Sequence, residues 1–221
     1  MTVAEWKLDA PDLPENLRED YPLRPAALQA MDDDEDVSRR LFCQQTLSAL
    51  SGGVLEFKSC RFDRCTFENV DVSRMSFVDC EFVKCEMSNL PLRGAALKRV
   101  QLTDCHLTGL LLEKASLTDV SFQRCMLDYL SLSESKLDRV VFDQCRMRES
   151  LWVNVKLGRV RFLEADLTKA EWSYTPLKGQ DLSNCHIDGI RIALPDLYGL
   201  RLTSAQLTAL SGLLGVVLTD R

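Results

Sequence analysis

The sequence lacks the features that would direct an interpretation toward a membrane protein. A membrane span needs about 20 consecutive apolar residues, and charged residues interrupt this chain too often for any run to reach that length. The opening MTVAEWKLDAPDL has neither a basic start nor an apolar stretch, so no leader peptide is expected. With 221 residues, 27% of them charged, the chain is predicted to be one soluble, cytoplasmic domain without a membrane partner.

Residues typical of catalysis and metal binding are also scarce. The chain has only two histidines, His106 and His186, and we find no phosphate-binding loop, nucleophile elbow or metal-ligand spacing. Ser131, Ser133 and Ser135 form a cluster, but no histidine is near enough to activate a hydroxyl. We therefore predict a protein that is not an enzyme, with no catalytic residue, no cofactor and no metal site.

A five-residue period dominates what is present. From Phe57 to Leu202 every fifth residue is Phe, Leu, Met, Val, Ile or Trp, over thirty consecutive positions. In a chain that is 46% hydrophobic, such a run has a chance probability of about one in ten billion. A second set, two residues before each of these, consists mainly of Cys, Val, Leu and Ala. Inward spacings that alternate between two and three fit neither a helix nor a continuous strand; they fit short strands separated by two-residue corners.

Like residues recur every 20 positions, which predicts the length of one coil. Three sets recur with this period, each in a phase of its own: Phe62, Phe82, Phe122, Phe142 and Phe162; Cys65, Cys85, Cys105, Cys125, Cys145 and Cys185; Trp152 and Trp172. Stacked columns of this kind stabilise flat parallel ladders, which are otherwise unusual. Twenty residues per coil give four faces, and thirty pentapeptides give seven and a half coils. At a ladder spacing of about 4.8 Å the shaft is about 36 Å long.

Two segments carry a resemblance to a known family. CRFDRCTFENVDVSRMSFVDCEFVKC and FLEADLTKAEWSYTPLKGQDL resemble the pentapeptide-repeat family, whose unit is [S/T/A/V/C]-[D/N]-[L/F]-[S/T/R]-x. The resemblance covers residues 55–204 and implies an all-β fold, a right-handed quadrilateral parallel β-helix with a short C-terminal helix. We divide the chain into an acidic, proline-rich N-terminal arm (1–46), the β-helix (47–204), and a C-terminal helix and tail (205–221).

The polar residues that could suggest chemistry are explained by this frame. Eight of the nine cysteines occupy the small inward position, where reduced thiols act as small hydrophobes, and only Cys43 lies outside it. Stacked cysteines about 4.8 Å apart exceed the Cβ separation of a disulfide, about 3.5 to 4.5 Å. His106 and His186 lie on one face about 19 Å apart, so they are not co-ligands and are expected to face solvent. Ser131 and Ser133 are expected to face outward and Ser135 inward.

Both ends depart from the period. Residues 1–46 contain four prolines and the acidic run MDDDED, which predicts an extended arm along the first coils. Its expected contacts are Leu13, Leu17, Tyr21 and Leu23, and AALQAM is expected to form a single helical turn. At the other end Thr203 and Gln206 predict a capping box, Gly215 a helix stop, and residues 216–218 a short strand.

The C-terminal segment has two interpretations. It either caps its own shaft or forms a dimer interface, because solenoid ends need covering and the segment is rich in leucine. The resemblance to Qnr-type members of the family, which dimerise through such a segment, favours a homodimer. The predicted interface consists of Leu207, Leu210 and Leu214 on one helical face, followed by Val216 and Leu218.

Charge is distributed unevenly along the chain and around the shaft. Residues 1–54 contain 11 acids and 5 bases, whereas residues 55–204 contain 21 of each. One face, centred on Phe57, Phe77 and Leu97, has 8 bases against 5 acids. The face over the cysteine column has 3 bases against six acids, the candidate partner-facing set: Glu68, Glu86, Asp128, Glu149, Asp166 and Asp188. The alternative is a solvated face with an ordinary imbalance.

The resemblance implies two non-catalytic functions. Qnr-type proteins imitate duplex DNA and dock in the basic DNA-binding saddle of type II topoisomerases, so the first hypothesis is a DNA mimic that binds DNA gyrase or topoisomerase IV and protects it from quinolones or related poisons. The second is an interaction scaffold with an unknown partner, since the fold alone does not choose between them. This chain has no insertion in its frame, unlike the looped members, which contact the topoisomerase through their loops. Direct nucleic-acid binding is not expected, because the basic face lacks interleaved aromatics.

Overall fold

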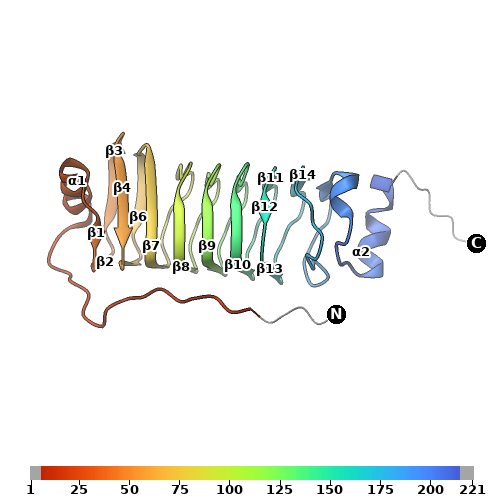
Figure 1. Ribbon diagram of the computed structural model, residues 1–221, viewed down its shortest axis with the longest axis horizontal. Helices are drawn as coiled ribbons and strands as arrows, with labels where there is room; N and C mark the ends of the chain where they lie inside the picture. Colours follow the sequence, from red (N-terminus) through yellow and green to blue (C-terminus); the bar gives the residue numbers. More distant parts are fainter. Residues whose placement is uncertain (1–5, 215–221) are drawn as a thin grey trace, which may run out of the picture.

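The computed structural model describes residues 6–214, which form a straight rod of stacked coils with a helix at each end (Figure 1). The helices are α1 (Leu23–Asp33), α2 (Ser204–Ala209) and the 3-10 helices η1 (Leu194–Leu197) and η2 (Ser211–Leu214). None of them is both long and apolar enough to cross a membrane. The strands are β1 (Val37–Ser38), β2 (Leu41–Cys43), β3 (Thr46–Ser51), β4 (Val54–Lys58), β5 (Arg61–Asp63), β6 (Thr66–Asp71), β7 (Arg74–Val83), β8 (Ala96–Thr103), β9 (Ser116–Gln123), β10 (Lys136–Asp143), β11 (Leu151–Val153), β12 (Lys156–Leu157), β13 (Val160–Leu163), β14 (Glu171–Ser173) and β15 (Arg191–Ile192).

The strand register confirms the 20-residue coil. Every pairing between these strands is parallel, and residues 20 apart face each other, as in Val37↔Phe57, Leu102↔Phe122 and Trp152↔Trp172. The longest sheet runs β1-β4-β7-β8-β9-β10-β12 along one side of the rod. Each strand therefore pairs with the coils before and after it, and the chain forms the predicted parallel β-helix.

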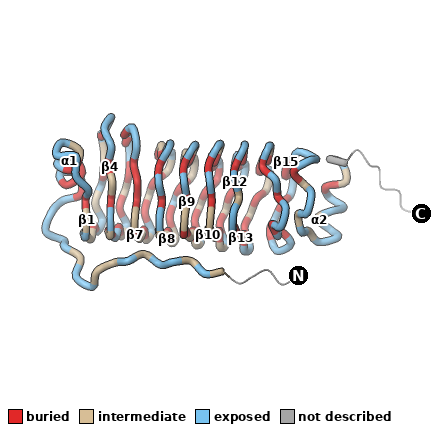
Figure 2. The backbone as a smooth tube through the Cα atoms, viewed as in Figure 1, coloured by how far each residue is buried: buried red, intermediate tan, exposed pale blue. Residues whose placement is uncertain are grey.

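The two inward sets form one continuous core along the axis. Figure 2 shows buried residues alternating with exposed ones around the coils. Like rings stack between neighbouring coils, with centroid separations of 4.6 Å for Phe62–Phe82, 5.0 Å for Phe122–Phe142 and 4.2 Å for Trp152–Trp172. Parallel aromatic stacking adds to the burial of apolar area, and this holds successive coils in register.

Most corners are turned by non-glycine residues in the left-handed region. Arg64, Asp104 and Asn154, for example, have φ of 52°, 55° and 54°. This conformation costs roughly 1–2 kcal/mol for a residue with a Cβ. Most corner N–H groups donate to a carbonyl of the next coil, as from Arg64 to Val83 over 2.8 Å, so the ladder offsets the strain.

Where the small inward position carries Cys, Ser or Thr, the side chain in most cases bonds a carbonyl of the coil before it. Ser135 donates its hydroxyl to the carbonyl of Leu112 and accepts the N–H of Ala115 over 3.0 Å. Cys105 places Sγ 3.6 Å from the carbonyl of Phe82. Burial raises the pKa of the Cys60 thiol to about 11. All eight cysteines at this position are buried as predicted, and Cys43 is exposed.

The N-terminal region is more ordered than the sequence indicates. α1 spans 11 residues rather than a single turn, and it covers the end of the core with Leu23 and Ala27, both fully buried. The first coil begins at Val37, before residue 47, because Phe42 and Leu47 already keep the frame. Glycine at position 52, the next frame position, hides this continuity in the sequence.

The C-terminal cap differs from the predicted helix. The capping box between Thr203 and Gln206 is present, but α2 ends at Ala209 and continues as η2. The Gln206 side chain donates 2.8 Å and 2.9 Å hydrogen bonds to the carbonyls of Leu182 and Cys185. Leu207 is 54% exposed whereas Leu210 is 4% exposed, so the two do not share one face. The Leu214 side chain and residues 215–218, with the predicted stop, strand, Val216 and Leu218, lie outside the described residues.

Candidate interaction surfaces

The six acids over the cysteine column differ in exposure. Backbone bridges join Glu86 to His106 and Asp166 to His186 across neighbouring coils, which places them in one column of the same face. Three of the acids are exposed: Glu68, Glu149 and Asp188. Glu86 and Asp166 are half-buried and Asp128 is buried.

The three less exposed acids have cationic or titratable partners. Arg146 pairs with Asp128 over 2.7 Å, Arg148 with Asp166 over 2.6 Å, and His106 lies 3.3 Å from Glu86. Burial opposes ionisation of Asp166, but hydrogen bonds from Thr168 and Arg148 outweigh it and hold its pKa below the usual value. The count of charges by face includes both arginines among its three bases, but a count does not show which acids they pair with.

Glu68, Glu149 and Asp188 have no cationic partner within 4.0 Å among residues 6–214. The Tyr129 hydroxyl lies 3.5 Å from Glu149. From Glu68 to Asp188 the face spans six coil steps, about 29 Å. Duplex DNA carries one charge about every 1.7 Å, so this face is far less negative than DNA.

The histidines and serines occupy separate environments. His106 and His186 are both exposed. Ser135 is fully buried as predicted, but Ser131 is 7% exposed rather than solvent-facing, because its hydroxyl lies over the coil below and contacts Glu113 at 3.3 Å. The hydroxyls therefore do not converge, and no catalytic arrangement follows from them.

Large apolar side chains are exposed near the C-terminal end. Tyr174 is 79% exposed and Tyr198 is 75% exposed. Leu194 is 53% exposed and Leu207 is 54% exposed. Of the predicted dimer contacts, Leu210 seals its own core and Leu207 remains available to a partner.

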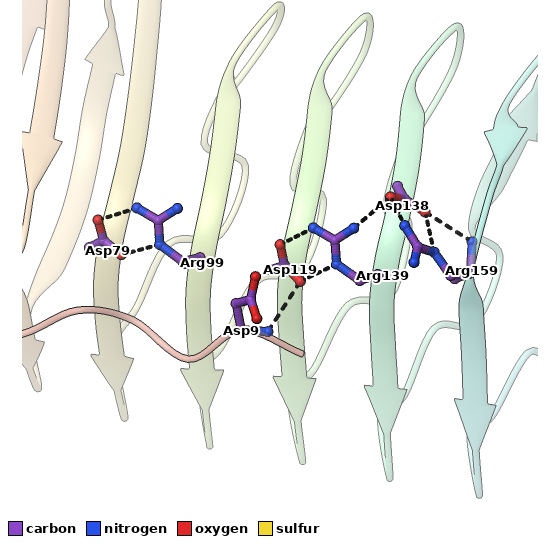
Figure 3. A network of polar contacts seen from close by, with 7 residues as sticks. All are labelled: Asp9, Asp79, Arg99, Asp119, Asp138, Arg139 and Arg159. Carbon is purple, nitrogen blue, oxygen red and sulfur yellow. Dashed lines mark hydrogen bonds and ion pairs between the residues drawn. The ribbon is translucent and has the colours of Figure 1, made fainter. Parts of the chain in front are cut away.

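A charged ladder along one corner was not recognised in the sequence. Arg99 makes a bidentate contact with Asp79 at 2.5 and 2.6 Å, Arg139 forks onto Asp119, and Arg159 lies 2.7 Å from Asp138 (Figure 3). The carboxyl side chains of Asp79 and Asp119 are 7% and 2% exposed. Hydrogen bonds from Arg99 and Arg139 lower the pKa of these carboxyls. The available signal was the alternation of Asp and Arg at positions 79, 99, 119 and 139.

The N-terminal arm lies across this corner, and it extends far beyond the first coils (Figure 1). The N–H of Asp12 donates to Asp79 over 3.0 Å and that of Asp9 to Asp119 over 3.2 Å. Arg161 in β13 donates to the carbonyl of Trp6 over 3.0 Å, and its guanidinium lies 4.2 Å from the ring centroid.

The contacts predicted for the arm are present only in part. Leu13 and Leu17 are half-buried, and Leu23 belongs to α1 rather than to the arm. Tyr21 is 39% exposed, and the guanidinium of Arg40 lies 5.8 Å from its ring centroid. The reach of the arm to β13 was not predicted.

Comparisons with known proteins decide the family. A family model described as pentapeptide repeats (8 copies) matches residues 60–99, and one described as a pentapeptide repeat region matches residues 95–172. The chain belongs to the pentapeptide-repeat family. No curated protein matches this pentapeptide-repeat chain significantly.

Several solved structures are similar to this pentapeptide-repeat protein. Trypsin-treated QnrB1, a plasmid-mediated fluoroquinolone resistance protein, is 22% identical, with 84% of this chain and 90% of that chain covered and a TM-score of 0.33. HetL, a pentapeptide repeat protein involved in heterocyst differentiation regulation in the cyanobacterium Nostoc sp., is 16% identical, with coverages of 76% and 85% and a TM-score of 0.33. Rfr23 from the cyanobacterium Cyanothece is 14% identical, with coverages of 81% and 99% and a TM-score of 0.22.

Proposed function

We propose that this protein is a non-catalytic DNA mimic in the cytoplasm that binds a type II topoisomerase, DNA gyrase or topoisomerase IV, and protects it from quinolones or related poisons. The observation that carries the proposal is the unbranched rod, which has unpaired acids spaced along one face. A basic DNA-binding saddle would accommodate such a rod, and opposite charge would steer the encounter. The sequence resemblance to Qnr-type members of the family supports the same conclusion.

Ionic contacts alone can supply only part of the binding affinity. Three unpaired acids, Glu68, Glu149 and Asp188, represent a small fraction of the charge on an equal length of DNA. We therefore expect shape to contribute more than ionic contacts, and the salt dependence to be weaker than for DNA itself. No insertion interrupts the coils between β1 and β15, so the shaft has to make the contacts that loops make in looped members.

A homodimer through the C-terminal segment is part of the proposal. Leu207 is exposed on α2, in the same region as the exposed side chains of Leu194 and Tyr198. A two-fold interface there would remove this apolar surface from water and extend the rod.

A second candidate, an interaction scaffold for another partner, is favoured by one observation. Asp128 and Asp166, near the centre of the acidic face, are neutralised within the shaft by Arg146 and Arg148. A surface of mixed and internally paired charge suits a protein partner as well as a DNA-binding saddle does.

The test is gyrase supercoiling at a fixed quinolone concentration while this protein is titrated. Restored supercoiling at low stoichiometry supports protection. Inhibition of supercoiling without protection indicates that the protein mimics DNA but does not shield the enzyme from the drug. The absence of any effect at high molar excess rejects the topoisomerase proposal and retains the scaffold. A parallel titration with topoisomerase IV distinguishes the two enzymes.

A charge-reversal set tests the acidic face without breaking internal ion pairs. The triple variant Glu68→Lys, Glu149→Lys and Asp188→Lys changes only acids without a close cation. The matched control reverses three exposed acids of other faces, Asp71, Glu134 and Glu164, with the same change in net charge; of these, Glu134 lies 4.0 Å from Lys114 in an exposed ion pair. The first variant should weaken binding and flatten its salt dependence, whereas the control should not. Equal effects from both would remove this face from the proposal.

A further inference from the structure

The N-terminal arm has the features of a peptide ligand bound in a groove of its own shaft. Its contacts recur every three residues, at Trp6, Asp9 and Asp12, and each meets a different coil. Extended backbone rises about 3.3 Å per residue, so three residues span about 10 Å, close to two ladder spacings of about 4.8 Å. The acceptors Asp79 and Asp119 are two coils apart, so the arm and the corner share a common repeat.

The charges of the arm complement those of the corner. Arg99 has a raised pKa, owing mainly to its hydrogen bonds with Asp79, and the Asp12 carboxylate contributes in the same direction. The pKa of Arg139 is raised mainly by its hydrogen bonds with Asp119, and the Asp9 carboxylate adds to this effect. Each arm aspartate therefore supplies an N–H to a shaft carboxylate and a negative charge near the adjacent arginine.

The prolines of the arm suit this mode of binding. Pro11 and Pro14 lie between and beyond the donor positions, where no N–H is required, and a proline ring maintains the extended backbone. At the far end the Trp6 ring is stacked by Arg161. A cavity of about 370 Å³ adjoins this contact, lined in part by Arg161, Asp181 and Arg201.

The remainder of the arm is loosely attached. Between Asp12 and Arg18 the described residues show no hydrogen bond from arm to shaft. Cavities of about 600 Å³ and 470 Å³ lie beside this stretch, the first next to Leu13 and Leu17 and the second next to Asp12 and Arg18. A segment held by a few separated contacts opens at low free-energy cost, so another chain with the same pattern has access to the groove.

We propose that the corner formed by Asp79, Arg99, Asp119, Arg139 and Arg161 is a binding site for an extended acidic peptide of a partner protein, with an aromatic residue followed at the third and sixth positions by acids, and that the N-terminal arm is its resident, displaceable occupant. Backbone N–H groups provide affinity, and the aromatic and acidic side chains provide specificity. This site is separate from the acidic face and does not depend on topoisomerase binding.

The test uses a fluorescein-labelled peptide of residues 6–18, WKLDAPDLPENLR, titrated with two forms of the full-length protein. One is wild type, whose tethered arm competes at an effective concentration of about 1 mM. The other carries Trp6→Ala, Asp9→Pro and Asp12→Pro, which remove the ring and both donors. Fluorescence anisotropy should show about tenfold tighter binding to the arm variant. Adding Arg161→Ala to that variant should weaken binding again. Far-UV circular dichroism verifies that each variant keeps the fold.

Two altered peptides provide matched controls. Proline at positions 9 and 12 removes the N–H donors, and alanine at the same positions keeps the donors but removes the carboxylates. The proline peptide should not bind, and the alanine peptide should bind more weakly with a flatter salt dependence. Equal binding of the native and proline peptides, or no binding of the native peptide to the arm variant below about 1 mM, would overturn the proposal.

Arm exchange between copies would also overturn it, because the groove would then belong to a second copy of this chain. In that case the wild-type mass would double with concentration, and the arm variant would remain monomeric even though its Leu207 is intact. If wild type and the arm variant have the same mass at every concentration, arm exchange is excluded and the proposed binding of a partner peptide is supported.

Discussion

Replacing Leu210 by alanine tests whether the C-terminal segment seals its own shaft. Leu210 is 4% exposed, and the last coil beneath it is also bound by the Gln206 side chain. Leucine-to-alanine changes in packed cores cost about 2–5 kcal/mol, and a site at the end of a core lies in the lower half of that range because the neighbours relax. We expect the free energy of unfolding to fall by about 2–3 kcal/mol. Leu207→Ala, at a 54% exposed position of the same helix, should cost about 0.5 kcal/mol or less.

The assay is urea unfolding followed by tryptophan fluorescence. Trp152 and Trp172 are buried about two and a half and one and a half coils before Leu202, where the repeat frame ends, and report on this part of the shaft. In a solenoid the loss begins locally, so amide hydrogen exchange should increase first in the coils after Trp172. Each kcal/mol of lost unfolding free energy, evaluated at the thermal midpoint, should lower Tm by about 2–4 °C for a chain of this size.

The relative effects of Leu207→Ala and Leu210→Ala decide whether α2 is seated on the shaft through Leu210. If Leu207→Ala destabilises the protein as much as Leu210→Ala, the two side chains are equivalent and α2 is not seated as described. Repeating the measurement at several protein concentrations separates cap loss from dimer dissociation, because only the latter depends on concentration. Light scattering of Leu207→Asp is the companion experiment: half the wild-type mass supports the dimer, and an unchanged monomeric mass for both proteins rejects it.

Three other predictions concern the core and the corner. Thr175→Val removes a hydroxyl that accepts the N–H of Val155 over 3.0 Å, so its unfolding free energy should fall by about 1–3 kcal/mol, whereas Thr175→Ser should lose less; equal urea midpoints for valine and wild type would contradict this. The pKa values of Asp79 and Asp119 are lowered in the fold, so their stabilisation is present above the unfolded pKa of about 3.9 and is lost as pH falls through the folded values. The double variant Asp79→Asn and Asp119→Asn should therefore lose less unfolding free energy than wild type as pH falls below about 4. Parallel plots of unfolding free energy against pH for the two proteins would contradict this prediction. A thiol reagent should modify Cys43 alone among the nine cysteines of the native protein, and rapid reaction of further thiols would show that the shaft opens.

The sequence alone determined which side chains form the core and how the coils align. Phe62, Phe82 and Phe122 could be placed inside and in one column because the same local choice, one apolar residue in five, is repeated along the whole shaft. Agreement over many repeats outweighs any single exception, and the 20-residue recurrence of like side chains defines the register. The capping box at Thr203 was equally accessible, since it involves residues three positions apart.

Only the tertiary structure decided which charges are available and what covers the corner. Asp128 and Asp166 count as surface acids in the sequence, but arginines one coil away neutralise them. The exposures of Leu207 and Leu210 depend on where a short helix ends. The arm reaches partners that are 67, 110 and 155 residues away along the chain. Such contacts are few and join residues far apart along the chain, so the sequence of the arm does not identify its partners, and they form only after the stacked coils have brought Asp79, Asp119 and Arg161 into one line.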